Sequence, residues 1–204
     1  MSSSPSYLDP LVLPLLKGET VLDVGCGVGR WGHLIRANYW EAGLARPPAV
    51  DGFDAFAPNV EACTRGGAYR TVWEQTLPGA LEGQWDTVLA SEVIEHLPQD
   101  AVDDVLTTLE GAARCRVILT TPNFPALRGG VEGTTGFNEW DAHLSYVSRA
   151  VFKARGYRVL GAGFGNPRNP LVRVGIRLHL ASSLTSVPRH LPSLGESIVA
   201  IKDT

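Results

Sequence analysis

The chain has 204 residues, a length typical of a single domain at roughly 100–200 residues per domain. Hydrophobic residues make up 44% of the sequence and charged residues 19%, so the chain can bury a sizeable core and is not a disordered protein. The formal net charge of −3 at pH 7 lacks the basic excess of a general nucleic-acid binder, and we expect no DNA partner.

Two features bear on the compartment in which the protein works. No uncharged apolar run approaches the ~20 residues that a membrane-spanning helix needs, and the polar start 1–5 lacks the pattern of a signal peptide. Cys26, Cys63 and Cys115 are odd in number and widely spaced, which predicts neither a disulfide framework nor a thiolate zinc site. We therefore expect a cytoplasmic protein without a transmembrane segment.

Short β-type runs alternate with helical stretches along the chain. Parallel strands need crossover connections, and helices between strands supply them, so the pattern predicts a doubly wound α/β fold. Strands are expected at residues 20–24, 50–53, 70–73, 87–90, 117–120, 158–160 and 197–201. Helices are expected at residues 10–17, with Asp9 as its cap, and at 29–39, 57–63, 101–113 and 149–155.

Two segments interrupt this alternation. Residues 122–141 lack periodicity and follow a strand, which places them at the carboxyl edge where open α/β sheets bind ligands. Residues 165–195 contain an amphipathic stretch at 171–184, in which Leu171, Val174 and Leu178 recur at helical spacing. We expect one domain, 1–204, in which 165–195 forms a cap or lid; a packing helix and an interfacial membrane helix are the alternatives.

A glycine-rich turn follows the first strand. Gly25, Gly27 and Gly29 alternate with other residues between the strand and the next helix, which lets a ligand approach the backbone and the helix N-terminus. The stretch also contains the spacing G-x-G-x-x-G of dinucleotide sites, ending at Gly32. Counting from the first glycine after the strand, however, places Arg30 where the last glycine belongs.

The residue before the turn indicates the charge of the ligand. Asp23 is poorly suited to a doubly charged pyrophosphate and well suited to a cation. A ligand with an ammonium and a sulfonium group, and no phosphate, fits this acid and a glycine floor better than NAD does. S-adenosylmethionine has that chemistry.

Three motifs together resemble the class I S-adenosylmethionine-dependent methyltransferases. Residues 23–29, Asp-Val-Gly-Cys-Gly-Val-Gly, are similar to the first motif, and Asp54 stands 25 positions after Gly29, where the family has its ribose-binding acid. Residues 85–98, Trp-Asp-Thr-Val-Leu-Ala-Ser-Glu-Val-Ile-Glu-His-Leu-Pro, resemble the fourth-strand motif, and 120–123 the fifth. The resemblance implies a Rossmann-like, seven-stranded sheet, mostly parallel with an antiparallel last strand.

The resemblance also implies a cofactor site. The turn and Asp23 would hold the methionyl part, Asp54 the ribose, and the ends of the third and fourth strands the adenine. A core role for Trp73 and a solvated Glu74 are the alternatives at the adenine end. The cofactor-binding residues expected on this basis are Asp23, Gly25, Cys26, Gly27, Gly29, Asp54, Trp73, Glu74, Ser91 and Glu92.

Two carboxylates and two histidines are the candidates for catalysis. Glu92, Glu95 and His96 are spaced i, i+3, i+4, which predicts one helical face just past the fourth strand. Imidazole titrates near neutrality, so His96 or His143 is expected to act as a general base, with Glu95 beside them. The four residues Glu92, Glu95, His96 and His143 also resemble the metal-binding tetrad of small-RNA 2′-O-methyltransferases. That similarity leaves divalent-metal binding open as an alternative, and for each histidine a structural role remains open as well.

These observations predict an S-adenosylmethionine-dependent methyltransferase. We expect transfer to oxygen of a small molecule or a glycan precursor, with a histidine base and no metal. A metal-dependent 2′-O-methyltransferase acting on RNA, a non-catalytic S-adenosylmethionine-binding module and an NAD-type oxidoreductase are the alternatives; the acidic net charge disfavours RNA.

Overall fold

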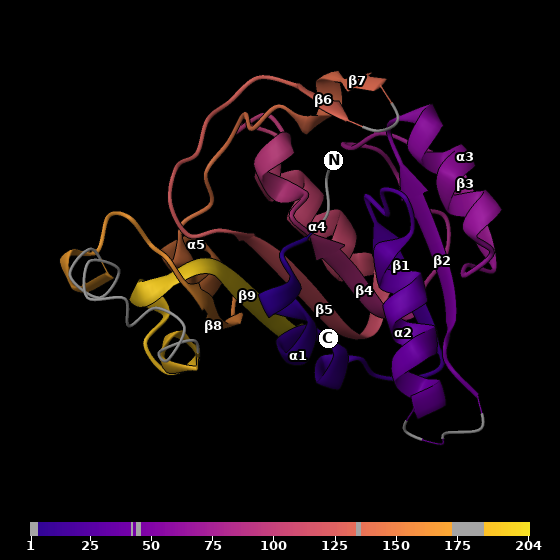
Figure 1. The fold of residues 1–204 in the computed structure, drawn as a ribbon, viewed down its shortest axis with the longest axis horizontal. Helices are drawn as coiled ribbons and strands as arrows, with labels where there is room; N and C mark the ends of the chain where they lie inside the picture. The colour runs from indigo at the N-terminus through magenta and orange to yellow at the C-terminus, as the bar shows by residue number, and fades with distance from the viewer. Residues whose placement is uncertain (1–3, 42, 44–45, 134–135, 173–185) are drawn as a thin grey trace.

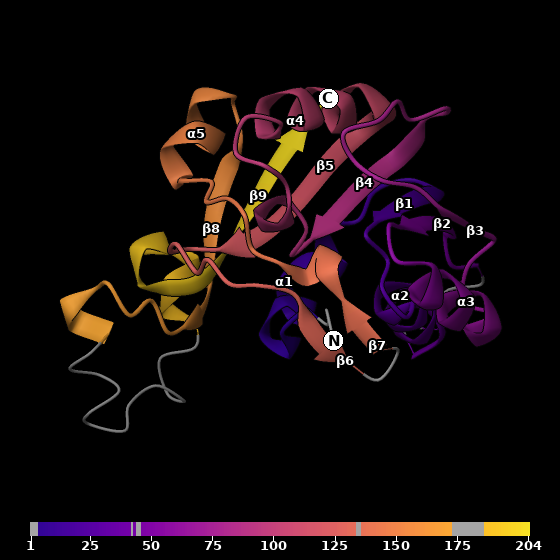
Figure 2. The same cartoon turned by 90° about the horizontal axis from the view of Figure 1, so that it is seen from above.

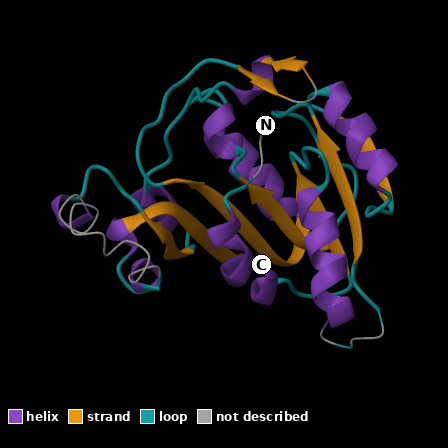
Figure 3. Ribbon diagram, viewed as in Figure 1, coloured by secondary structure: helices purple, strands orange, loops and turns teal. Residues whose placement is uncertain are grey.

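The computed structural model describes residues 4–204 apart from residues 42, 44–45, 134–135 and 173–185. Its strands are β1 (Thr20–Val24), β2 (Ala49–Asp54), β3 (Thr71–Glu74), β4 (Trp85–Ser91), β5 (Ala113–Pro122), β6 (Val131–Gly133), β7 (Gly136–Asn138), β8 (Arg158–Phe164) and β9 (Gly195–Asp203). The α-helices are α1 (Asp9–Val12), α2 (Arg30–Glu41), α3 (Ala57–Gly66), α4 (Val102–Ala112) and α5 (Arg149–Ala154), and short 3₁₀ turns accompany them (Figure 3). None of the described helices is long and apolar enough to cross a membrane.

Seven of the described strands form one sheet in the order β3-β2-β1-β4-β5-β9-β8. The pairs β3–β2, β2–β1, β1–β4 and β4–β5 are parallel, whereas β9 runs antiparallel to both β5 and β8. The predicted fold class, a seven-stranded and mostly parallel sheet with an antiparallel last strand, is confirmed. The order reverses at β1, so the carboxyl ends of β1 and β4 flank the crevice where such sheets bind ligands.

Helices cover both faces of the sheet, with α1, α2 and α3 on one side and α4 and α5 on the other (Figure 2). Alternate strand residues point to opposite faces, so each helical layer packs on its own half of the core. Val21, Leu89 and Ile118 pack with α1 and α2, whereas their chain neighbours Leu22 and Val88 pack on the α4 side. The sheet is thus buried on both faces and exposes its carboxyl edge.

The first helix differs from the sequence expectation. A single helix was expected over 10–17, but α1 ends at Val12 and a 3₁₀ turn, Leu13–Leu15, follows. Pro14 explains the change, because it lacks an N–H and its ring clashes with the carbonyl four residues earlier in an α-helix. Asp9 is not the cap either, because Leu8 occupies that position and Asp9 instead pairs with Arg30 at 2.6 Å.

The structure describes 122–141 more fully than 165–195, the second segment that interrupts the alternation of strands and helices. Residues 122–141 carry the β6–β7 hairpin and the 3₁₀ turn Glu139–Asp141, so the expectation of an aperiodic loop is wrong for its second half. The hairpin lies beyond the carboxyl ends of the central strands (Figure 1). Residues 173–185, most of the amphipathic stretch expected to form a lid, lie outside the described residues.

Candidate functional site

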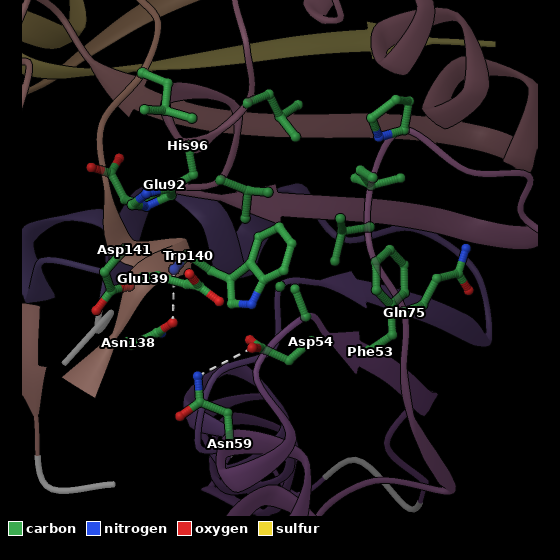
Figure 4. Close-up of a pocket in the computed structure, with 18 of the residues that line it drawn as sticks. Phe53, Asp54, Asn59, Gln75, Glu92, His96, Asn138, Glu139, Trp140 and Asp141 are labelled. Carbon is green, nitrogen blue, oxygen red and sulfur yellow. Dashed lines mark hydrogen bonds between the residues drawn. The ribbon is translucent and has the colours of Figure 1, made fainter. Parts of the chain in front are cut away.

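A pocket of about 240 Å³, partly open to solvent, lies at the carboxyl edge of the sheet (Figure 4). Its floor includes Gly25 after β1, Asp54 at the end of β2 and Glu92 after β4. The segment 138–141 supplies the opposite wall, and His96 lies in the wall that follows β4. The pocket therefore occupies the position that the strand order predicts for a ligand.

The glycine turn has the backbone shape that only glycine adopts without strain. Gly25, Gly27 and Gly29 have φ values of 65°, 54° and 95°, all in the left-handed region. At Gly25 an added Cβ would also lie 2.7 Å from a methyl carbon of Val93. The turn is therefore fixed by its own conformation and by its packing against the segment after β4.

Asp54 joins the glycine turn to the second strand. Its Oδ2 accepts a hydrogen bond from the Gly27 amide at 2.8 Å, and its Oδ1 accepts bonds from the amide of Phe56 and the side chain of Asn59 (Figure 4). Burial raises the pKa of Asp54 above its usual value, and the three donors counteract that rise. The carboxyl is thus held rigidly at the pocket floor, with one edge toward the cavity.

Asp23 lies beneath the turn and does not line the pocket. Its side chain is buried, and Oδ2 accepts a hydrogen bond from the hydroxyl of Tyr69. Its Oδ1 has no hydrogen-bond partner among the described residues. Burial raises the pKa of Asp23 to about 7, against the lowering effect of Tyr69. Of the expected methionyl-side residues, the pocket wall includes Gly25 and leaves out Asp23, Cys26, Gly27 and Gly29.

Trp73 and Glu74, the residues expected to bind the adenine, do not line the pocket. Trp73 stacks between Phe53 and Trp85, with ring centroids 5.5 and 6.4 Å away, and packs against the core. Glu74 is exposed and lies outside the pocket lining. The chain that follows β3 lines the pocket instead, through Gln75, Leu77 and Pro78.

Glu92 occupies a strained turn at the end of β4. Its φ of 57° is the only positive value at a non-glycine residue in the described chain, and such strain concentrates at functional sites. Its Oε1 accepts a hydrogen bond from Thr120 at 2.9 Å, and burial raises its pKa to about 7. The helical face expected for Glu92, Glu95 and His96 is therefore wrong, because the 3₁₀ turn begins only at Ile94.

Ser91 is held away from the pocket. Its hydroxyl lies 2.8 Å from that of Ser4 and 2.9 Å from that of Thr120. The Trp31 indole donates to Ser4 as well, so the N-terminal segment is pinned against the end of β4. Ser91 does not line the pocket, and its hydroxyl instead holds the N-terminal segment against the end of β4.

Glu95, His96 and His143 come together beside the pocket. Ligand atoms of the three lie within 4.8 Å of one another, and the two imidazole rings meet edge to face with centroids 4.8 Å apart. Glu95 is buried, and its Oε2 accepts a hydrogen bond from Thr121. Burial and the neighbouring Glu92 raise the pKa of Glu95 well above its usual value, so this acid favours its neutral form.

The two histidines differ in access to the pocket. His96 lines it, and its Nδ1 donates to the carbonyl of Ala142 at 3.1 Å, because a carbonyl only accepts. The other ring nitrogen is then the acceptor in the neutral ring. Burial lowers the pKa of His96, and burial with His96 and Arg128 lowers that of His143 to about 4. His143 lies behind His96, outside the pocket lining.

The segment 138–141 contributes functional candidates that sequence patterns did not single out. Asn138, Glu139, Trp140 and Asp141 all line the pocket, and Asn138 Oδ1 accepts a hydrogen bond from the Trp140 amide at 3.0 Å. The available signal was the run Asn-Glu-Trp-Asp itself, in which a capping residue precedes a large aromatic residue. Its position on the far side of the cavity depends on the hairpin before it.

Comparisons with known proteins agree with this architecture. Residues 5–160 match the model of a family described as a methyltransferase domain. A search of curated proteins found no match. Among solved structures, the chain is similar to magnesium protoporphyrin IX methyltransferase from Synechocystis PCC 6803 with bound S-adenosylhomocysteine, at 19% identity and a TM-score of 0.55, covering 97% of this chain and 78% of that one.

Two more solved structures share the fold at low identity. An S-adenosylmethionine-dependent methyltransferase from Archaeoglobus fulgidus has a TM-score of 0.57 at 16% identity, covering 98% of this chain and 92% of that one. The plantazolicin methyltransferase BpumL has a TM-score of 0.53 at 12% identity, covering 98% and 80%. The family match spans more than half of the chain and confirms the methyltransferase family predicted from the sequence motifs. This protein therefore belongs to a family of methyltransferase domains.

Proposed function

We propose that the protein binds S-adenosylmethionine and transfers its methyl group to oxygen of a small molecule, with His96 as the general base. One pocket brings together the glycine turn at Gly25, the carboxyl of Asp54 and the imidazole of His96, and this observation carries the proposal. The cavity would therefore have one side for the methyl donor, at Gly25 and Asp54, and another for the methyl acceptor, at His96.

The lining suits the charge of the proposed donor. Four carboxyl side chains, Asp54, Glu92, Glu139 and Asp141, line the pocket, and its described lining holds neither Lys nor Arg. A pyrophosphate would be repelled there, whereas a ligand with sulfonium and ammonium groups is attracted. The acids thus favour S-adenosylmethionine over NAD, as the register of the glycine turn does.

Each part of the donor has a natural place in the pocket. Asp54 accepts hydrogen bonds from the ribose hydroxyls, and Gln75, Leu77 and Pro78 enclose the adenine. Glu92 lies beside Gly25 on the floor, because Val24 and Ala90 are partners in the β1–β4 register. Asp23 turns away toward Tyr69, so Glu92 is the acid that meets the amino group of the methionyl part, and Asp23 supports the turn from below.

When bound, S-adenosylmethionine supplies an electrophilic methyl group on a sulfonium centre. The pocket walls around His96 would hold the acceptor hydroxyl beside the donor, and positioning of this kind is a main source of rate in a displacement. His96 takes the proton of the hydroxyl on the ring nitrogen that does not bind Ala142. The Ala142 carbonyl fixes the ring orientation, and burial keeps the ring neutral and ready to accept at neutral pH.

The acceptor is proposed to be a small molecule, a glycan precursor included. Structural neighbours named for magnesium protoporphyrin IX and plantazolicin show that this fold serves varied acceptors. The acidic lining speaks against a phosphate-rich acceptor such as RNA.

A metal-dependent reaction is the second candidate, and the cluster of Glu95, His96 and His143 favours it. Two imidazoles and one carboxylate suit a divalent transition metal. Glu92 is not part of this cluster, so the four-residue set expected from the resemblance is reduced to three. Because burial raises the pKa of Glu95, a metal would have to displace a proton to bind there.

Methyl transfer to a panel of hydroxylated acceptors tests the proposal, with His96→Ala, His143→Ala and the control His33→Ala, an exposed residue of α2, compared in chelator and in added Mg²⁺ or Mn²⁺. The base mechanism predicts chelator-resistant activity, a loss of ~10²–10⁴-fold for His96→Ala, and no change for the control. Chelator-sensitive activity restored by metal would support the metal mechanism. Full activity of His96→Ala would remove His96 from catalysis.

Three broader expectations complete the proposal. We propose that 1–204 works as one domain, that 165–195 caps the acceptor side, and that the protein is cytoplasmic. Cys26, Cys63 and Cys115 are free thiols, which supports a reducing compartment. The lid is supported by the end of β8, because β8 runs parallel to β5 and so leads into 165–195 at the carboxyl edge, where the pocket lies.

A further inference from the structure

The indole of Trp140 is the largest side chain that the acceptor wall presents to the cavity. It projects into the pocket from the turn after β7 (Figure 4) and remains 46% exposed. Asn138 holds this turn through the Trp140 amide, so the ring is presented by a fixed backbone. A large aromatic surface left bare inside a pocket indicates a ligand that covers it.

Apolar side chains also line the cavity. Val93, Leu97 and Pro98 line the cavity along the segment after β4, on the same side as His96. Leu144 lines it as well and is 53% exposed. The cavity that His96 lines is therefore also lined by an aromatic ring and by aliphatic side chains, which suits a flat, apolar body.

Charge restricts the ligand further. Glu139 and Asp141 flank Trp140 in sequence and line the same wall. Together with Asp54 and Glu92 they make four acids against the one net positive charge of S-adenosylmethionine. An acceptor with a carboxylate or phosphate near this wall would be repelled by the negative charge of Glu139.

We infer that the acceptor is an aromatic compound that bears a hydroxyl group and no negative charge, stacked on Trp140, with Glu139 excluding anionic analogues. The inference rests on the proposed methyl transfer and names its substrate class. Trp140 determines specificity by its aromatic plane, and Glu139 by its charge.

Three phenols of matched size test the inference by calorimetric titration into the complex with S-adenosylhomocysteine. They are 4-propylphenol, which is neutral, tyramine, which is cationic, and 3-(4-hydroxyphenyl)propionate, which is anionic. The neutral phenol is expected to bind at least tenfold more tightly than the anionic one. Comparable binding of the neutral and the anionic phenol, or tyramine binding no more tightly than the anionic phenol, would overturn the inference.

Matched variants assign the two effects to residues. Trp140→Ala is expected to weaken 4-propylphenol about tenfold, while Phe137→Ala, exposed on the same hairpin and outside the pocket lining, leaves it unchanged. Glu139→Gln is expected to improve binding of the anionic phenol, and Glu132→Gln, on β6, is its control. Equal effects in variant and control would contradict the assigned roles.

The titration also separates this inference from the proposed function. Failure of S-adenosylhomocysteine to bind the wild-type protein overturns the methyl-donor site and the inference with it. Normal binding of S-adenosylhomocysteine without preference among the phenols overturns the inference alone.

Discussion

The hydroxyl of Tyr69 donates a hydrogen bond to the buried carboxyl of Asp23, beneath the glycine turn. The same hydroxyl accepts the Gly32 amide at 3.0 Å, and the ring fills the space beside Gly32 and Gly52. Gly32, which completes a dinucleotide-like spacing in the sequence, is therefore required by the packing of a tyrosine. The aromatic ring fixes the helix that starts at the turn relative to β1 and β2.

This packing predicts that Gly32→Ala destabilises the protein. An added Cβ would lie 2.3 Å from a Tyr69 ring carbon, and overpacking of a well-packed site costs ~1–3 kcal/mol. Gly111 in α4 is the matched control, because an added Cβ there has no atom within 4 Å. Gly111→Ala is expected to stabilise the helix by ~0.5–1 kcal/mol. Urea unfolding of both variants measures the difference, and equal changes would contradict the role of Tyr69.

The buried Asp23 predicts a fall in stability from acid toward neutral pH. Burial raises its pKa from 3.8 to about 7, so the unfolded chain releases the proton first as pH rises. Between about pH 4 and about pH 7 the folded state binds more protons than the unfolded state, and the free energy of unfolding decreases over that window. Asp23→Asn should remove this contribution. Chemical unfolding at pH 5 and pH 8 tests it, and the same pH dependence in both proteins would contradict it.

Glu92 predicts a selective effect on the amino-acid part of the cofactor. Glu92→Gln removes the charge that meets the ammonium group, and we expect S-adenosylhomocysteine to bind about tenfold more weakly, since hydrogen bonds to charged groups contribute ~1.5–3 kcal/mol. 5′-Methylthioadenosine lacks the amino acid, so its affinity should stay unchanged. A parallel loss for both ligands would place Glu92 elsewhere in the site.

The lowered pKa of His96 predicts that methyl-transfer activity persists in mildly acidic conditions. Burial lowers the pKa of His96 below its usual value of 6.5, so the neutral, active form persists as pH falls below that value. Activity should therefore decline only at a pH below 6.5 and should lose this acid limb in His96→Gln. An acid limb centred above pH 6.5 would contradict a buried neutral base.

The fold could be predicted because apolar runs and glycine turns are local signals. The strand ending at Val24 and the position of Asp54 follow from such signals, and both lie where the sequence places them. The backbone conformation of Glu92 could not be predicted from the sequence, because its left-handed backbone depends on hydrogen bonds to Thr120 from another strand. Trp140 was missed because a short hairpin, not its own periodicity, carries it to the pocket.

The direction in which a side chain points was the harder part of the site. Strand alternation separates Asp51 from Asp54, and the structure agrees: Asp51 binds Arg70 and the Trp85 indole, while Asp54 faces the glycine turn. Asp23, by contrast, turns toward Tyr69, which comes from after α3 and gives no signal next to the motif. Contacts between distant segments therefore decide which acids reach the ligand.

Calorimetric titration of S-adenosylhomocysteine into the wild-type protein, Asp54→Ala and Asp51→Ala tests the central claim most directly. Asp54→Ala should weaken binding by ~2–4 kcal/mol, because hydrogen bonds to a charged group contribute ~1.5–3 kcal/mol each and do not add fully. Asp51→Ala, which removes a buried acid of the same strand outside the pocket lining, should lower the free energy of unfolding and leave affinity intact. Wild-type affinity in folded Asp54→Ala, or no binding by the wild-type protein, would contradict the account.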